Sequence, residues 1–142
     1  MTTMRRYQNE ADYGRIRNFL REVFAADGGQ PQGWDVARFD YWRWHVIANC
    51  GVCDPIEQVT FFWEENGRII ALLNPEANGQ AFFTVHPAWH TPELAAEMLD
   101  VAENHLRKQA NGNGYSLTVF ANPNDPIYTT LLNQRRYQPQ AD

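Results

Sequence analysis

The residues best suited to chemistry lie in the stretch 81–106, where a short apolar run is followed by the segment His86–His90. Two histidines four residues apart could bind a metal or act as an acid–base pair. Pro87 prevents a helix from bringing them together, and the chain has no H-E-x-x-H pattern. We therefore interpret both as loop histidines that pack against Trp89, and we expect no metal site.

Two other pairs of side chains could each have either a chemical role or a purely structural one. Cys50 and Cys53 form a C-x-x-C motif that could be redox-active or could supply half of a zinc site. Zinc would need two further ligands at suitable spacing, so we interpret the motif as part of a loop. Glu64 and Glu65 could include a general base. Because they stand beside an Asn-Gly pair, we favour a charged turn at the solvent end of a hairpin.

An aromatic cluster lies between residues 34 and 44 and includes three of the chain's five tryptophans. Such rings could line a small-molecule pocket, or they could fill the core of the fold. Five tryptophans in 142 residues favour a pocket or a surface between domains. We take Trp34 and Trp42 from this cluster, with Phe83 from the apolar run, as candidate substrate-binding residues.

Local signals predict the elements that hold these residues. The run Ala81–Val85 predicts a short strand, Thr91 fits a helix N-cap, and Pro92 fits the first helical position. Apolar residues at three- and four-residue spacing then continue the helix to Leu106. A strand that enters a helix through a tight loop directs backbone N–H groups at one spot, where an anionic ligand can bind.

The rest of the chain predicts one mixed α/β domain over residues 1–142. The Asn66-Gly67 pair predicts a turn between two strands. The predicted strands are Arg5–Gln8, Gln58–Trp63, Arg68–Leu73, Ala81–Val85 and Tyr115–Phe120. The predicted helices begin at Asp12, Asp35, Pro92 and Ile127, with Asp35 and Asp125 as caps of the second and the last. These two helices end near His45 and Arg135. The order β-α-α-β-β-β-α-β-α indicates a mostly antiparallel, mixed sheet with helices on both faces.

The overall composition excludes several classes of protein. A net charge of -5 argues against a general nucleic-acid binder, which would present a basic face. No run approaches the roughly 18 apolar residues that a membrane span needs. The N-terminal segment MTTMRRYQNE has no apolar stretch behind its arginines, so it does not read as a signal peptide. We therefore expect a cytoplasmic protein that binds neither nucleic acid nor membrane.

This order of elements, together with three local phrases, resembles the GNAT-type N-acetyltransferases, which use acetyl-CoA to acetylate amines. The phrases are the hairpin QVTFFWEENGRIIALL, the strand end Phe83–Pro87 and the segment from Asn124 to Tyr137. The resemblance implies acetyl-CoA as cofactor, a small-molecule amine as acceptor, and loop amides that hold the pyrophosphate of CoA. The residues that it assigns to the acetyl-CoA site are Thr84, Val85, His90, Leu94, Ala95 and Ala96.

The chain departs from the family pattern at the loop that should hold the pyrophosphate. The family's Arg/Gln-x-x-Gly-x-Gly/Ala corresponds here to the segment His90–Ala95. Pro92 has no N–H to donate, and Glu93 places bulk and negative charge where phosphate would lie. Repulsion between partly desolvated like charges costs on the order of a few kcal/mol, which is orders of magnitude in affinity. We therefore expect a degenerate acetyl-CoA loop.

A second departure concerns the last helix, where the family usually has a tyrosine as general acid. The matching positions hold Leu131 and Leu132, and Tyr128 lies about one turn earlier. Tyr128 is the candidate catalytic residue if this helix is rotated relative to the family register. The chain then ends where the family adds two strands. We therefore expect either the N-terminal half of a tandem GNAT protein, completed by a second GNAT-like domain, or a homo-oligomer that borrows strands.

Three functions remain open from the sequence. The leading hypothesis is a GNAT-like domain with a degenerate acetyl-CoA loop, which acts as a partner or half-domain and shapes an acceptor site. The second is an active N-acetyltransferase whose acceptor is a polyamine, an amino acid or an aminoglycoside. The third is a non-enzymatic module that binds a small molecule through its aromatic cluster.

Overall fold

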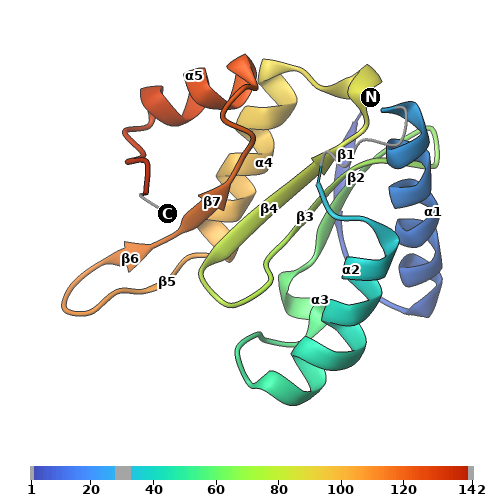
Figure 1. Cartoon of the computed structure of the whole chain (residues 1–142), viewed down its shortest axis with the longest axis horizontal. Helices are drawn as coiled ribbons and strands as arrows, with labels where there is room; N and C mark the ends of the chain where they lie inside the picture. Colours follow the sequence, from blue (N-terminus) through green and yellow to red (C-terminus); the bar gives the residue numbers. More distant parts are fainter. Residues whose placement is uncertain (1, 28–32, 141–142) are drawn as a thin grey trace.

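A five-stranded sheet with helices on both faces forms the body of the molecule (Figure 1). The computed structural model describes residues 2–27 and 33–140. In spatial order the strands are β1 (Thr3–Arg6), β2 (Phe61–Glu65), β3 (Arg68–Asn74), β4 (Gln80–Val85) and β7 (Thr118–Phe120). The helices are α1 (Glu10–Ala26), α2 (Val36–Tyr41), α3 (Ile56–Val59), α4 (Pro92–His105) and α5 (Pro126–Gln134). The short strands β5 (Lys108–Gln109) and β6 (Tyr115–Ser116) pair with each other in a ribbon that projects from the body (Figure 1).

The hairpin between β2 and β3 turns at Asn66 and Gly67, as the sequence predicts. Their φ values are 53° and 76°, a left-handed conformation that asparagine and glycine tolerate best. The pairs β1–β2, β2–β3 and β3–β4 are all antiparallel, and only β4 and β7 pair in parallel within the described part of the sheet. The predicted mixed, mostly antiparallel sheet is therefore confirmed.

Successive side chains of β2 pack against helices on opposite faces of the sheet. Arg15 of α1 lies over the ring of Phe62, with its Cζ 5.7 Å from the ring centroid. Trp63 is the next residue, and its indole N–H donates to the carboxylate of Glu97 in α4. Because neighbouring side chains of a strand point to opposite faces, α1 and α4 cover opposite sides. Both Phe62 and Trp63 are fully buried, so the sheet has a core on each face.

Side-chain caps fix the starts of the helices near the candidate site. Asp35, Thr91 and Asp125 each accept a hydrogen bond from a backbone amide in the first turn of the helix that follows, at 2.8, 3.2 and 3.0 Å. These three predicted caps are confirmed. Helix α1 begins at Glu10 rather than at Asp12, because the side chain of the preceding Asn9 provides its cap. Among the described residues, no helix is long and apolar enough to cross a membrane.

The region between α2 and β2 is more helical than the sequence predicts. Helix α2 does not end near His45 but passes into the π-helical segment η1 (Trp42–Cys50), which ends where Gly51 adopts a φ of 66°. The strand predicted from Gln58 begins only at Phe61, after the single turn α3. Ile56 and Val59 are three residues apart, so a helical turn buries both of them on one side.

The predicted strand Tyr115–Phe120 is divided into two parts that pair with different partners. Its first part, β6, pairs with β5, whereas its second part, β7, pairs with residues 80–82 of β4. Residues 83–85 of β4 lie beyond this paired stretch, and Figure 1 shows the two strands diverging there. The divergence leaves a gap in the sheet next to the N-terminal end of α4.

Candidate functional site

The gap between β4 and β7 exposes backbone groups of β4. The amide of His86 donates to the carbonyl of Ile70 in β3 (3.0 Å), and the amide of Thr118 in β7 donates to the carbonyl of Gly79 (2.8 Å). Because backbone groups alternate between the two edges of a strand, the N–H of Val85 points away from β3 and into the gap. An extended ligand can bind along such an edge as an added strand would.

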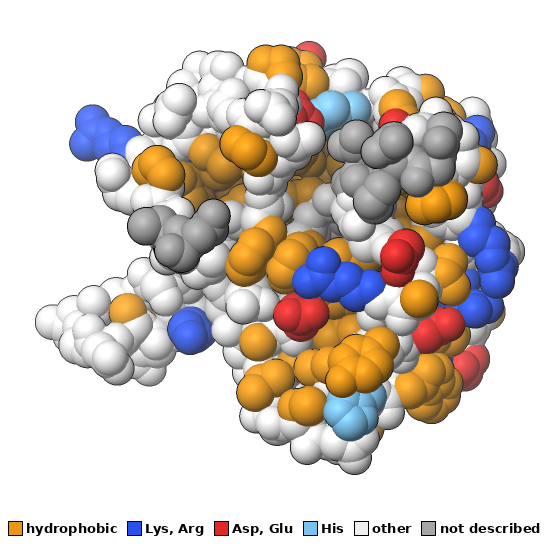
Figure 2. All heavy atoms as spheres, viewed as in Figure 1, with side chains coloured by type: hydrophobic (Ala, Val, Ile, Leu, Met, Phe, Trp, Pro, Cys, Tyr) orange, Lys and Arg blue, Asp and Glu red, His pale blue; other side chains and the backbone are white. Residues whose placement is uncertain are grey.

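A cavity of about 320 Å³ lies beside this gap, between α2, β4 and the segment that follows β7. Half of its described lining residues carry aromatic rings, and charged and polar groups share the wall with them. The lining residues are Gly33, Trp34, Arg38, Phe82, Phe83, Phe120, Ala121, Asn122, Asp125 and Tyr128. Figure 2 shows this face, with hydrophobic side chains around a basic and an acidic side chain over α2. We call this cavity the aromatic cavity.

A larger, open hollow of about 680 Å³ lies on the other side of β7. It is bounded by residues 117–123, by α5 and by the polar segment 137–140, and none of the described residues in its lining is charged. The aromatic cavity therefore has the stronger case as the chemical site, because charged side chains line it and it brings together the candidate residues Trp34, Phe83 and Tyr128.

Tyr128 lies where the aromatic cavity meets the gap. Its ring is 5.4 Å from the ring of Phe83 and 5.1 Å from that of His90, measured between centroids. The side chain is only 7% exposed, and its hydroxyl has no hydrogen-bond partner among the described residues. Burial, helped by the negative charge of Asp125, raises the pKa of Tyr128 above its usual value. The phenol is therefore protonated at neutral pH.

His90 and Asp125 form a direct contact that ties the loop after β4 to α5. Nε2 of His90 lies 2.6 Å from Oδ2 of Asp125, and Oδ1 of Asp125 accepts from the amide of Ile127. The prediction that both histidines pack against Trp89 is correct for His86, whose ring lies 5.1 Å from the indole, but wrong for His90. His90 instead packs against Tyr128, because the pairing with Asp125 holds its ring toward α5.

Most backbone amides of the loop between β4 and α4 donate hydrogen bonds to acceptors within the same loop. The amide of Ala88 donates to Nδ1 of His86, and the amides of Leu94 and Ala95 donate to the hydroxyl and carbonyl of Thr91. The amides of Trp89 and His90 donate to the carbonyls of His86 and Pro87 in the 3₁₀ turn η2 (Pro87–Trp89). With prolines at 87 and 92, only the amides of Thr91 and Glu93 have no hydrogen bond within the described loop. Glu93 adds an exposed carboxylate to this first turn.

The other candidate acetyl-CoA residues contribute mainly to packing. Thr84 is buried, and its hydroxyl accepts from the amide of Trp34 at 3.2 Å. Leu94 and Ala95 are buried under the first turn of α4. The carbonyl of Ala96 accepts from Arg135 of α5 at 3.4 Å. Of the predicted set, the structure therefore leaves the backbone of Val85 and the side chain of His90 facing the gap.

The candidate substrate residues separate into cavity wall and core. Trp34, Phe83 and the candidate catalytic residue Tyr128 come together in the lining of the aromatic cavity. Trp42 is 1% exposed and lies behind Trp34, where its indole N–H donates to the carbonyl of Glu76 at 3.1 Å. It supports the wall but does not line the cavity.

Arg38 is the cavity residue that sequence reasoning missed. Its guanidinium lies over the rings of Trp34 and Phe82, at 4.6 and 4.8 Å from their centroids. Phe82 in turn stacks on Phe120 across the β4–β7 pair, at 4.3 Å and an interplanar angle of 4°. No local pattern marks this position, because Arg38 reads as an ordinary charged residue on the exposed side of a short helix.

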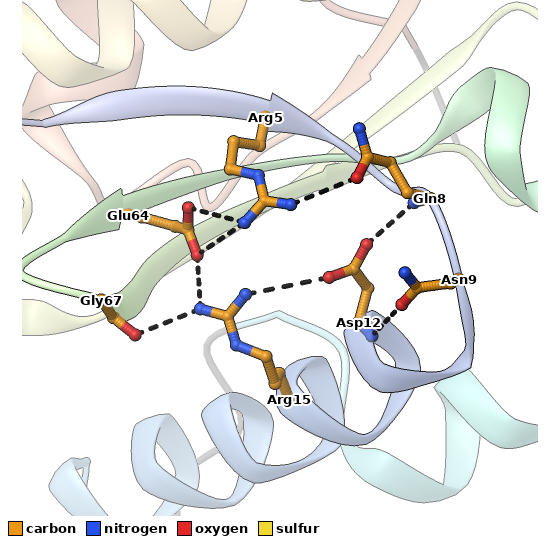
Figure 3. A network of polar contacts seen from close by, with 7 residues as sticks. All are labelled: Arg5, Gln8, Asn9, Asp12, Arg15, Glu64 and Gly67. Carbon is orange, nitrogen blue, oxygen red and sulfur yellow. Dashed lines mark hydrogen bonds and ion pairs between the residues drawn. The ribbon is translucent and has the colours of Figure 1, made fainter.

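Glu64 is a structural anion rather than a general base. Figure 3 shows its carboxylate between Arg5 and Arg15, with Asp12 on the far side of Arg15. Burial by itself raises the pKa of Glu64, but the hydrogen bonds from Arg15 and Arg5 outweigh it and hold this pKa below its usual value. Glu65 accepts from the indole N–H of Trp89 at 2.6 Å, so it joins the hairpin to the loop after β4.

The cysteine motif has no arrangement suited to chemistry. Cys50 ends η1 and is exposed, whereas Cys53 is half-buried, and burial raises the pKa of its thiol to about 11. A thiol with a raised pKa is a poor nucleophile at neutral pH. The residues that the structure describes contain no cluster of His, Cys, Asp or Glu able to hold a metal ion.

Several solved structures that superpose on this chain are acetyltransferases. Neither the known family models nor the curated proteins match this sequence. The ribosomal-protein-S18-alanine N-acetyltransferase of Escherichia coli superposes with a TM-score of 0.61 at 12% identity, over 99% of this chain and 80% of its own. The chain has the GNAT fold.

Two further structures share the GNAT fold with this chain. One is an aminoglycoside N-acetyltransferase in complex with CoA, with a TM-score of 0.58 at 11% identity, over 100% of this chain and 91% of its own. The other is a predicted acetyltransferase of Clostridium acetobutylicum with acetyl-CoA, with a TM-score of 0.58 at 18% identity, over 100% and 93%. The predicted α/β architecture and its resemblance to GNAT proteins are therefore confirmed at the level of the fold.

Proposed function

We propose that this chain is a GNAT-fold domain that presents a cavity for a small amine but carries a degenerate acetyl-CoA loop, and that it acts as a partner or half-domain. The observation that carries the proposal is the hydrogen bonding of the loop between β4 and α4. Five of its amides already donate to groups within the loop, so few remain for a pyrophosphate.

The residues of this site suit the amide-containing arm of acetyl-CoA better than its pyrophosphate. The open edge of β4 at Val85 suits an extended, amide-containing arm, because such an arm can pair with a strand edge. The loop suits the pyrophosphate poorly, because Pro92 lacks a donor and Glu93 repels phosphate at the helix N-terminus, where an anion would otherwise be stabilised. The balance favours weak binding of the whole molecule.

The partner role is supported by the edge of the sheet. In the part of the chain that the structure describes, β7 pairs with β4 on one side only and forms the sheet's edge. An exposed edge strand is a natural place for a strand of another domain or of a second copy to pair.

The experiment is a calorimetric titration of acetyl-CoA and of desulfo-CoA into the folded protein. The proposal predicts a dissociation constant above about 1 mM for both ligands, and a micromolar value would overturn it. Glu93→Gln removes the charge while keeping the size of the side chain, and it should tighten binding about tenfold. Glu57→Gln, at an exposed position in α3, makes the same change in net charge and should leave the affinity unchanged.

A second candidate function is an active N-acetyltransferase, and Tyr128 is the observation that favours it. The phenol stays protonated at neutral pH, as a proton donor must, and it lies at the gap between β4 and β7. Two of the similar structures are named as acetyltransferases of a protein alanine and of an aminoglycoside, so an amine acceptor is the expected class. Acetylation of an amine that Tyr128→Phe abolishes, at unchanged stability, would favour this candidate over the first.

A further inference from the structure

We propose that the amine accepted by the aromatic cavity is an amino acid with an aromatic side chain, and that Arg38 binds its free carboxylate. This inference rests on the assignment of the cavity as the acceptor site under the proposed function. It selects one class among polyamines, amino acids and aminoglycosides, which the sequence alone leaves open.

Arg38 is positioned to receive a carboxylate. Its guanidinium is held against two walls of the cavity by the rings of Trp34 and Phe82. Its ion pair is with Glu76, from Nη2 to Oε1 at 3.2 Å, and both side chains are more than 40% exposed. An exposed ion pair of this kind contributes little, so a ligand can displace Glu76 from the guanidinium. Arginine then offers a planar pair of donors that matches a carboxylate.

The described residues of the cavity offer no comparable partner for a cationic ligand. Arg38 and Asp125 are the charged residues in the part of its lining that the structure describes. Each oxygen of Asp125 already has one polar contact, one with His90 and the other with the amide of Ile127 at the start of α5. A polyamine or an aminoglycoside would therefore meet a positive guanidinium and a carboxylate that is shared with His90 and the start of α5. In a molecule with one amine and one carboxylate, the guanidinium of Arg38 instead attracts the carboxylate.

The remaining wall fits an aromatic side chain. Five rings line the cavity, from Trp34, Phe82, Phe83, Phe120 and Tyr128. Phe82 and Phe120 stack face to face, and Phe120 is an exposed ring against which a further ring can pack. The volume of about 320 Å³ is at the lower end of the range for ligand pockets, which suits a single amino acid better than an oligosaccharide.

The test compares two ligands that differ only in the carboxylate, L-phenylalanine and phenethylamine. Binding of each is measured by calorimetry and by quenching of tryptophan fluorescence, without acetyl-CoA. We expect the wild-type protein to bind phenylalanine at least about tenfold more tightly than phenethylamine, and spermidine more weakly than either. Arg38→Met keeps most of the apolar stem and should abolish the preference for phenylalanine. Arg21→Met, on the exposed side of α1, is the matched control and should preserve it.

A second variant gives a change of opposite sign. Glu76→Gln removes the competing carboxylate but keeps the backbone carbonyl that accepts from Trp42, so it should tighten phenylalanine binding several-fold. Equal affinity for the two ligands, tighter binding of spermidine, no binding of phenylalanine, or no effect of Glu76→Gln would each overturn the inference. Because acetyl-CoA is not used, these outcomes are independent of the CoA titration that tests the proposed function.

Discussion

Nε2 of His90 lies 2.6 Å from Oδ2 of Asp125, and this contact joins the loop after β4 to the first turn of α5. In the GNAT-like reading of the sequence, His90 occupies the arginine or glutamine position of the pyrophosphate loop. The same side chain is here directed to α5 and packs on Tyr128. The loop and the last helix are therefore held to each other across the place where the sheet opens.

The pairing of His90 with Asp125 should appear as a coupling energy. His90→Ala removes the pair, whereas Asp125→Ala removes both the pair and the α5 cap, which alone is worth about 1 kcal/mol. We expect the double variant to be less destabilised than the sum of the single variants, by about 1 kcal/mol, in urea unfolding. Additive effects would mean that the contact contributes nothing to stability.

Tyr128 and Tyr137 should respond in opposite directions to loss of the hydroxyl. The Tyr128 hydroxyl is buried without a partner, so Tyr128→Phe should leave the free energy of unfolding unchanged or raise it by up to about 1 kcal/mol. The Tyr137 hydroxyl donates to Glu103 at 2.7 Å, so Tyr137→Phe should cost about 1 kcal/mol. Chemical denaturation of both variants measures this, and a clear loss of stability in Tyr128→Phe would indicate a hydrogen bond that the structure does not contain.

Gly33 should not tolerate a side chain, because it lies directly against β4. A Cβ atom built on Gly33 would lie 2.4 Å from Oγ1 of Thr84, a buried and β-branched residue with little freedom to move. Gly33→Ala should therefore destabilise the protein by about 1–3 kcal/mol and displace Trp34. Gly14 of α1 has open space around its Cβ position, so Gly14→Ala should stabilise by about 0.5–1 kcal/mol. Equal effects in urea unfolding would contradict the close approach at Thr84.

The ion pairs of Glu64 should make part of the stability pH-dependent. The folded-state pKa of Glu64 is lower than the unfolded value of about 4.3, so its contribution is present above that pH. The contribution is lost as pH falls through the folded-state pKa, when the carboxylate between Arg5 and Arg15 becomes protonated. Glu64→Gln should therefore flatten the loss of stability between pH 6 and pH 3 in urea unfolding. Parallel curves for wild type and variant would contradict this role.

The sequence predicts the helices and turns that local chemistry determines. Thr91, Asp125 and the Asn66-Gly67 pair act within their own turn, and the structure places them as predicted. The order of strands and helices along the chain follows from the same local signals, so the fold class is also predicted correctly. The predicted helix end near His45 is wrong, because the helical segment continues to Cys50. Burial of Trp42 and Val46 in the core favours this continuation, and no local sequence signal reveals it.

The candidate site is less predictable because it is formed by contacts distant in sequence. His90 and Asp125 are 35 residues apart, and the guanidinium of Arg38 in α2 lies over the ring of Phe82 in β4. Trp34 and Trp42 look equivalent in sequence, yet one lines the cavity and the other is buried behind it. The hydrogen bonds that the loop amides make cannot be predicted from the sequence either, although Pro92 and Glu93 already indicate a weak phosphate site.

The most direct measurement of the central claim compares CoA with pantetheine, which has the extended arm but no phosphate. Both ligands are titrated calorimetrically into the wild-type protein at the same ionic strength. If the loop between β4 and α4 gives the pyrophosphate no useful donors, CoA will bind no more than about tenfold more tightly than pantetheine. A preference for CoA of more than about a hundredfold would show that the loop does hold the pyrophosphate, and would contradict the account of a degenerate site.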